Sequence, residues 1–383
     1  MTLKDGYQEE FGFIGLILIT ILIRMPLLLG GIVGIDAANN AHAAQVILDG
    51  GLLYIDAPFA YPPLYAFTEA LFFAVFGNSA LIWKVVPLIY DLGIIVLVYL
   101  IVATNSTKKK GLMAAALYSF SPLPLIATTL SGSFDSTAAF WMLLSVLLLF
   151  REQYIYSAAA LAIGVAYKYF PILIAFPALL YIKDNRQRMK YFFTFTTLSI
   201  LIELPFIMLS RDAWFSYVVE FPFTRGSSGY SFYNLFSESP NIWKGPQDFW
   251  AIQPMIMLAL LAMIALNKRR ANIDLLRQSN LILVIFILFN KVVLYYALWY
   301  IPIFCIYITQ NESRWNSLML PLFFLLQFLL VAGGTLASLN NEWLALQIGY
   351  PYLIASILLS LILTLEFLEH HSSLERPNPE LQE

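Results

Sequence analysis

Residues 11–30 read FGFIGLILITILIRMPLLLG, an apolar run whose length decides how this chain folds. A helix needs about 20 such residues to cross the ~30 Å hydrocarbon core of a bilayer. Comparable runs lie at 80–103, 251–266 and 350–368. They lack the period-two alternation of a membrane β-barrel, and a helix satisfies its backbone hydrogen bonds within its own segment. The chain is therefore predicted to be an all-α, polytopic integral membrane protein.

The composition agrees with a membrane location. Of 383 residues, 60% are hydrophobic and 12% charged, more apolar surface than a soluble domain can bury. We expect the first run to be a retained span, because it is longer than the apolar part of a signal peptide and no small-x-small cleavage site directly follows it. With Cys305 as the single cysteine, no disulfide framework is expected. No long basic patch is present, so we expect membrane lipids and no nucleic acid among the partners.

We expect about 12 helices (roughly 10–13) in one transmembrane domain over residues 1–371, followed by a disordered cytoplasmic tail at 372–383. The expected spans are 11–30, 80–103, 112–130, 134–150, 155–167, 171–182, 191–209, 251–266, 279–292, 294–309, 316–335 and 345–368. Two connecting loops are long, at 31–79 and 210–250.

Basic residues indicate the orientation. They cluster at 108–110, 183–190 and 268–270, so by the positive-inside rule these loops and both termini are cytoplasmic and the two long loops extracytoplasmic. The cations that fall elsewhere are Arg24, Lys84, Lys168, Arg211, Arg225, Lys244 and Lys291. Arg24 and Lys84 are expected to snorkel to an interface. For Lys168, Arg211, Arg225 and Lys291 an anionic lipid phosphate is a natural partner, with outer acids such as Glu203 or Asp212 as the alternative.

Two pairs of predicted segments are too short to span simply. One pair turns around residues 167–171 and the other around Asn290 and Lys291. Such turns at membrane depth are tolerated where they line a cavity; the alternative is that the predicted boundaries are misplaced. In the first long loop, Pro62 and Pro63 can start a helix. We therefore expect a short surface helix at 64–76, with Glu69 on its wet face.

Two acids are candidates for chemistry. Asp36 follows the first span, and a carboxylate at a lipid–water boundary can act as a general base; the alternative is a capping or solvated loop residue. Asp135 lies in the stretch 131–136 between two spans. It is either a second acidic group facing Asp36 across a cavity or the N-cap of the following helix. The aromatic residues at 295–296 and 299–300 fit an interfacial belt, although sugars also stack on such rings.

Taken together, these segments resemble the GT-C glycosyltransferases, with the closest likeness to the enzymes that add the first mannose to glycosylphosphatidylinositol and to prokaryotic polyprenyl-phosphate-mannose-dependent mannosyltransferases. The pieces that carry the resemblance are Gly34–Asp36, Ala60–Leu64, Gly132–Ser136, Tyr167–Pro171, Asn290–Lys291 and Leu298–Tyr300. They occur in the family's order, and the likeness extends from residue 11 to about residue 310.

The resemblance implies an inverting glycosyltransferase with a polyprenyl-phosphate sugar donor, mannose by analogy, and a lipid-linked or glycan acceptor at the extracytoplasmic face. Asp36 matches the second acid of an Asp-x-Asp motif, and Gly34 stands in place of the first. A carboxylate pair for metal binding is therefore lacking, so no metal ligand is predicted, while a divalent cation as cofactor stays open. The predicted site comprises the catalytic residues Asp36 and Asp135 and the substrate-binding residues Lys168, Lys291, Arg225 and Tyr61. The resemblance supplies the roles of Asp36, Asp135, Lys168 and Lys291 alone, and Arg225 comes from charge placement.

Two other classes compete. A transporter or lipid flippase also fits many spans with broken helices, although no duplicated pattern relates the two halves and the polar residues cluster on one side. A non-catalytic membrane scaffold is the third class, for which the acidic outer loop would be unusual. An enzyme should gather Asp36, Asp135 and the cations around one outward-opening cavity, whereas a transporter should have a central site reachable from both sides.

Overall fold

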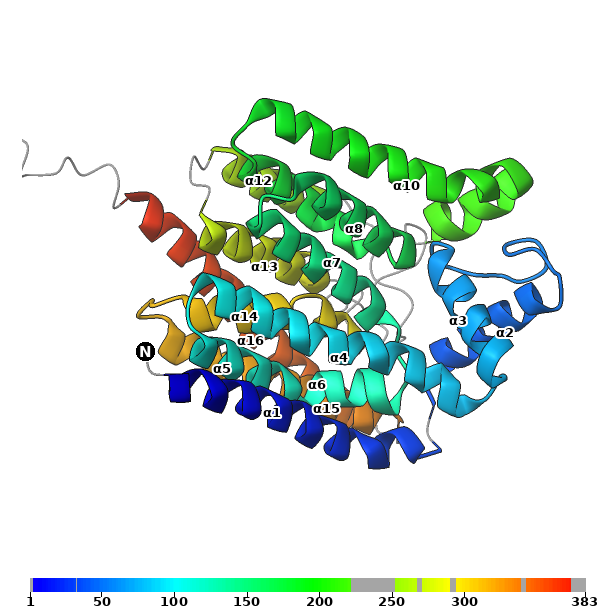
Figure 1. The fold of residues 1–383 in the computed structure, drawn as a ribbon, viewed down its shortest axis with the longest axis horizontal. Helices are drawn as coiled ribbons and strands as arrows, with labels where there is room; N and C mark the ends of the chain where they lie inside the picture. The colour runs from blue at the N-terminus through cyan, green and yellow to red at the C-terminus, as the bar shows by residue number, and fades with distance from the viewer. Residues whose placement is uncertain are drawn as a thin grey trace, which may run out of the picture.

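The structure, a computed structural model, describes residues 3–31, 33–221, 252–266, 271–289, 294–338 and 342–372. Within these ranges the chain is helical and contains no β-strand beyond one isolated bridge. The long helices run side by side in one bundle, and α2 (Ile35–Leu48) and α3 (Leu64–Phe76) gather at one end of it (Figure 1). The all-α prediction is confirmed for the described part of the chain.

The main helices are α1 (Leu3–Leu29), α4 (Ala80–Asn105), α5 (Lys108–Ser119), α7 (Asp135–Phe150), α8 (Tyr154–Tyr167), α9 (Ala175–Tyr181), α10 (Asn185–Trp214), α12 (Ile252–Leu266), α13 (Asn272–Phe289), α14 (Ile301–Gln310), α15 (Asn316–Ser338) and α16 (Glu342–Ser372). Shorter or irregular segments are α6 (Pro122–Pro124), η1 (Leu125–Leu130), η2 (Phe170–Ile174), η3 (Phe215–Glu220) and η6 (Leu294–Trp299). Over its described residues, each predicted span thus lies mainly in helical structure.

By length and composition, four helical stretches among the described residues can cross a membrane: Glu9–Leu29, Ala80–Asn105, Asn185–Glu220 and Asn316–Leu336. The count rises to five if α5 and the segment Pro122–Leu130, bent by 50° relative to each other, form one span. The total of about twelve crossings stays a prediction. Residues 222–251, which make up most of the predicted second long loop, and the tail after residue 372 lie outside the described residues.

Two cations that were expected to snorkel are instead buried in the bundle. Arg24 pairs with Asp91 at 2.8 Å, and Tyr118 donates to the same carboxylate at 2.6 Å, which joins α1, α4 and α5. Lys84 donates to the carbonyl oxygen of Gly30 at 2.6 Å, just beyond the end of α1. Both cations are 1% exposed. The snorkelling prediction is wrong because each cation finds acceptors inside the protein and does not need the interface.

The predicted break at 167–171 is confirmed. Helix α8 ends at Tyr167, its C-cap Lys168 has extended backbone (φ −161°, ψ 137°), and Pro171 is the second residue of the 3₁₀ segment η2. The second predicted turn, at Asn290 and Lys291, lies outside the described residues. The next described segment is η6, which precedes α14.

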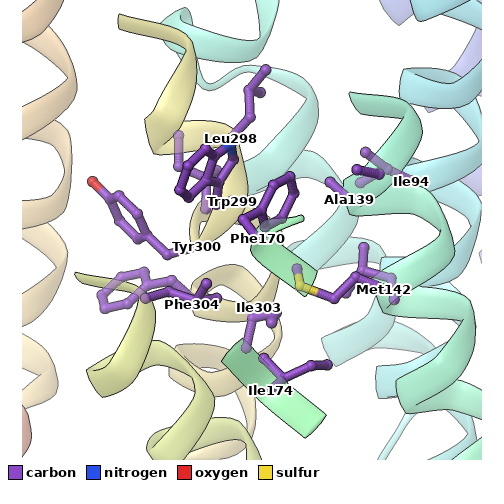
Figure 2. Close-up of a cluster of buried hydrophobic side chains, with 14 of the residues drawn as sticks. Ile94, Ala139, Met142, Phe170, Ile174, Leu298, Trp299, Tyr300, Ile303 and Phe304 are labelled. Carbon is purple, nitrogen blue, oxygen red and sulfur yellow. The ribbon is translucent and has the colours of Figure 1, made fainter. Parts of the chain in front are cut away.

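A buried apolar cluster holds α7, η2 and η6 against one another (Figure 2). Phe170 of η2 stacks on Trp299 of η6, with ring centroids 4.4 Å apart and planes 4° from parallel. Ala139 and Met142 of α7 and Ile174 of η2 belong to the same cluster and are essentially unexposed. Two of these segments, α7 and η6, carry polar groups described next, and η2 directly follows Lys168; close packing therefore fixes the surroundings of the site.

Candidate active site

The two acidic motifs meet because their backbones dock. The N–H of Gly34 donates to the carbonyl oxygen of Ser131 at 2.9 Å, so the loop before α7 lies against the start of α2. Gly132 has φ +70°, a conformation that favours glycine, and a Cβ there would lie 3.4 Å from the Cβ of Ala37. As a result, Asp36 in the first turn of α2 and Asp135 in the first turn of α7 reach the same end of the bundle.

Asp135 forms a buried ion pair with Lys168. The Lys168 Nζ donates to both carboxylate oxygens, at 2.8 and 2.9 Å. Two further donors reach the same carboxylate: Ser133 Oγ at 2.7 Å and Trp299 Nε1 at 2.5 Å. Each oxygen thus accepts two hydrogen bonds, which is close to the capacity of a carboxylate. The N-cap alternative does not apply, because Phe134 is the N-cap of α7 and no side chain caps the helix.

Aromatic rings surround the ammonium group of Lys168. Its Nζ lies 4.6 to 5.9 Å from the ring centroids of Phe134, Tyr61, Tyr296, Tyr295 and Trp299. Cation–π attraction favours a charged lysine in such a setting. The Tyr61 ring forms one side of this aromatic cage. The backbone carbonyl oxygen of Tyr61 accepts a hydrogen bond from the Tyr54 hydroxyl at 2.7 Å.

Asp36 joins the same site through Tyr295. The Tyr295 hydroxyl donates to Asp36 Oδ2 at 2.6 Å, while its ring lies 5.4 Å from Lys168 Nζ. Asp36 is half-buried, and no described residue donates to its Oδ1. One tyrosine thus connects the acid of α2 to the ion pair formed by α7 and the end of α8.

The structure therefore brings together four of the six predicted site residues: Asp36, Tyr61, Asp135 and Lys168. Arg225 and Lys291 lie outside the described residues. Tyr295, Trp299 and Ser133 were not predicted as hydrogen-bond partners of the two acids. The two aromatic residues had fitted an interfacial belt. For Tyr295 and Trp299, the signal that could have indicated a site was their place soon after the polar pair Asn290 and Lys291 in an apolar run.

The carboxylate set bears on metal binding. In place of a first motif acid, Gly34 faces the Ser131 carbonyl, and a Cβ on residue 34 would lie 2.9 Å from that oxygen. A side chain at this position requires the Ser131 loop to shift. The described ranges contain no group of three or more His, Cys, Asp or Glu side chains able to hold a metal ion. The residues present therefore offer Asp36 alone at the motif.

A second buried acid lies close by, on α3. Glu69 is unexposed, and neither of its carboxylate oxygens has a hydrogen-bond partner in the described structure. Burial raises the pKa of Glu69 to about 9, so this side chain is a neutral acid at physiological pH. The prediction that Glu69 faces water is wrong, because α3 packs on α2 and also contacts α4 and α8.

A family model described as Glycosyltransferase family 87 matches residues 59–290, more than half of the chain. The chain belongs to glycosyltransferase family 87. The resemblance to the GT-C glycosyltransferases is thereby confirmed. The matched range includes Tyr61, Asp135 and Lys168 but begins after Asp36.

Two solved structures share the fold. ArnT from Cupriavidus metallidurans bound to undecaprenyl phosphate gives a TM-score of 0.59 at 12% identity, over 91% of this chain and 76% of ArnT. The apo oligosaccharyltransferase from Archaeoglobus fulgidus gives 0.54 at 11% identity, over 95% of this chain and 56% of that protein. A comparison with curated proteins found no match in sequence. The family match and the fold together identify an integral membrane glycosyltransferase of the GT-C type, which replaces the transporter and scaffold alternatives.

Proposed function

We propose that this family 87 protein transfers a hexose from a polyprenyl-phosphate donor to a hydroxyl of a lipid-linked or glycan acceptor, with Asp36 as general base. The observation that carries the proposal is the shared site. Asp36, whose Oδ1 accepts no hydrogen bond from any described residue, contacts one tyrosine that also borders the buried Lys168. An inverting transfer to a hydroxyl requires a base that accepts the hydroxyl proton and a nearby cation that stabilises the leaving phosphate.

Hydrogen bonding distinguishes the roles of the two carboxylates. Asp135 accepts four hydrogen bonds, two of them from Lys168, so it has little capacity left for the proton of an acceptor hydroxyl. From the described side chains Asp36 accepts one hydrogen bond, on Oδ2, and Oδ1 can take the proton. We therefore assign the base to Asp36 and give Asp135 the task of holding Lys168 in place.

In the proposed reaction the acceptor oxygen attacks the anomeric carbon as its proton passes to Asp36. The bond between that carbon and the phosphate oxygen breaks, so the polyprenyl phosphate leaves and the anomeric configuration inverts. The ammonium of Lys168 stabilises the growing negative charge on the phosphate. Because Asp36, Asp135 and Lys168 together carry a net charge of about −1, further cations are needed, and Arg225 and Lys291 are the candidates.

The lipid donor is supported by similarity. ArnT, whose fold this chain shares, was solved with undecaprenyl phosphate bound, and a polyprenyl phosphate places its tail in the bilayer beside the bundle. Mannose as the sugar rests on the likeness to mannosyltransferases. The extracytoplasmic location of the site, with both termini in the cytoplasm, rests on the distribution of basic loops.

The test is transfer by purified protein in lipid vesicles. Radiolabelled polyprenyl-phosphate mannose, glucose and galactose are supplied with a polar lipid extract as acceptor, and labelled lipid product is measured. Asp36→Asn should lower turnover by about 10²–10⁴-fold. Asp49→Asn is the matched control, because Asp49 is an exposed acid at the opposite end of the same helix. Wild-type turnover by the Asp36 variant would remove Asp36 from the mechanism.

A further inference from the structure

The short segment η6 reaches both acids of the site. Its Tyr295 donates to Asp36, which is 259 residues away in sequence, and its Trp299 donates to Asp135, which is 164 residues away. The two carboxylates come from different helices, α2 and α7, and within the described residues η6 is the one segment whose side chains hydrogen-bond to both.

Packing holds Tyr295 in place. Its ring makes an edge-to-face contact with Tyr296 at 5.4 Å, and Tyr296 stacks on Trp299 at 4.2 Å. Trp299 is in turn stacked on Phe170 within the apolar cluster of Figure 2. The Tyr295 hydroxyl is therefore presented by a rigid series of rings, as preorganised sites require.

Among the described residues, Tyr295 is the only one whose side chain donates a hydrogen bond to Asp36. An aspartate side chain rotates about two bonds, so without a donor its carboxylate can turn away from the acceptor. A donor on Oδ2 restricts this rotation and leaves Oδ1 for the incoming hydroxyl. The bond is charge-assisted, which makes it stronger than one between neutral groups.

We propose that Tyr295 is a positioning residue for transfer: its hydroxyl holds the carboxylate of Asp36 in the orientation needed for proton abstraction. This inference rests on the proposed role of Asp36 as base. Tyr295 keeps its own proton throughout, and the acceptor's proton passes to Oδ1. Since the same ring borders Lys168, Tyr295 also sets the distance between the base and the cation that faces the leaving phosphate.

Tyr295→Phe removes the hydroxyl and keeps the ring, so it tests the hydrogen bond alone. We expect kcat to fall about 10–100-fold, with KM for radiolabelled polyprenyl-phosphate mannose nearly unchanged. Tyr300→Phe is the matched control. It deletes the same atom one residue beyond η6, where the side chain is directed away from Phe170 (Figure 2), and it should leave kcat unchanged.

A double-variant cycle separates positioning from a structural effect. If Tyr295 acts through Asp36, adding Tyr295→Phe to Asp36→Asn should lower the residual turnover no further. An equal loss in both backgrounds, or a rise in KM alone, would overturn the inference. If Tyr295→Phe has the wild-type kcat while Asp36→Asn is inactive, the inference about Tyr295 is overturned, but the role of Asp36 as general base is not. Full turnover by Asp36→Asn would instead refute the proposed function.

A second pair of variants covers the case in which Tyr295→Phe folds poorly. Tyr295→Gln retains an N–H donor, whereas Tyr295→Leu does not. Turnover per folded molecule, with folding judged by gel filtration, should be higher for the glutamine variant. Equal turnover of the two variants would contradict a role for the donor.

Discussion

Asp135→Asn is the perturbation that most directly tests how the site is held together. The substitution removes the negative charge and keeps the size of the side chain, so the ion pair between Lys168 and residue 135 is lost. Lys168 is 1% exposed and cannot turn to water without breaking the packing of the surrounding rings. Those rings contact the ammonium in the wild type as well, so they do not replace the lost attraction.

The expected cost follows from the burial of the pair. Removing one partner of a buried ion pair destabilises a protein by about 3–5 kcal/mol, because the other charge stays buried and uncompensated. Adding Lys168→Met removes both charges and should recover most of the loss. Glu312→Gln is the control. It breaks the surface ion pair of Glu312 with Lys110, whose side chains are 86% and 35% exposed, respectively, and should cost about 0–1 kcal/mol of stability.

The assay uses the only cysteine of the chain. Cys305 is fully buried, so a thiol-reactive dye labels it when the core opens on heating in detergent. Asp135→Asn should unfold at a clearly lower temperature than the wild type, the double variant near the wild type, and Glu312→Gln indistinguishably from it. Unchanged unfolding of Asp135→Asn, or a double variant less stable than the single one, would refute the reasoning.

Two further predictions concern the same end of the bundle. The pKa of Glu69 is raised from 4.5 to about 9, so the folded state binds more protons between these values and its stability should fall as pH rises; Glu69→Gln should flatten this dependence between pH 5.5 and 8, and an unchanged slope in the dye assay would contradict it. Gly34→Ala places a Cβ 2.9 Å from the Ser131 carbonyl, whereas a Cβ on Gly31 meets nothing within 4 Å. Because a shift of about 1 Å can cost 10²-fold in rate, Gly34→Ala should lose turnover and Gly31→Ala should not; equal turnover would argue against the docking of these two loops.

The sequence predicted the helices well because bilayer physics acts locally. An apolar run must satisfy its own backbone, so the stretch 80–103 could hardly be anything but the helix found at 80–105. The break at 167–171 was also visible, since a lysine followed by a proline interrupts an apolar pattern. Asp36, Asp135 and Lys168 were found by the order of their motifs, and the structure brings all three together.

The predictions that proved wrong have one cause in common: they concern side chains whose surroundings are set by long-range packing. Glu69 was expected in water because the pattern of α3 does not reveal that other helices cover it, and Arg24 was expected at an interface because its partner Asp91 lies 67 residues away. The difference between the two catalytic candidates also depends on donors from distant segments.

Sequence by itself thus determined that this chain is a helical membrane protein and which polar residues stand out from an apolar background, because hydrophobicity and charge are properties of single residues. Only the tertiary structure decided that Asp135 is saturated with hydrogen bonds while Asp36 keeps an oxygen free of described donors. The physical reason is that the hydrogen-bond capacity of a carboxylate is taken by whichever donors the fold brings within about 3 Å. Tyr295 and Trp299 are 259 and 164 residues away in sequence from the acids to which they donate.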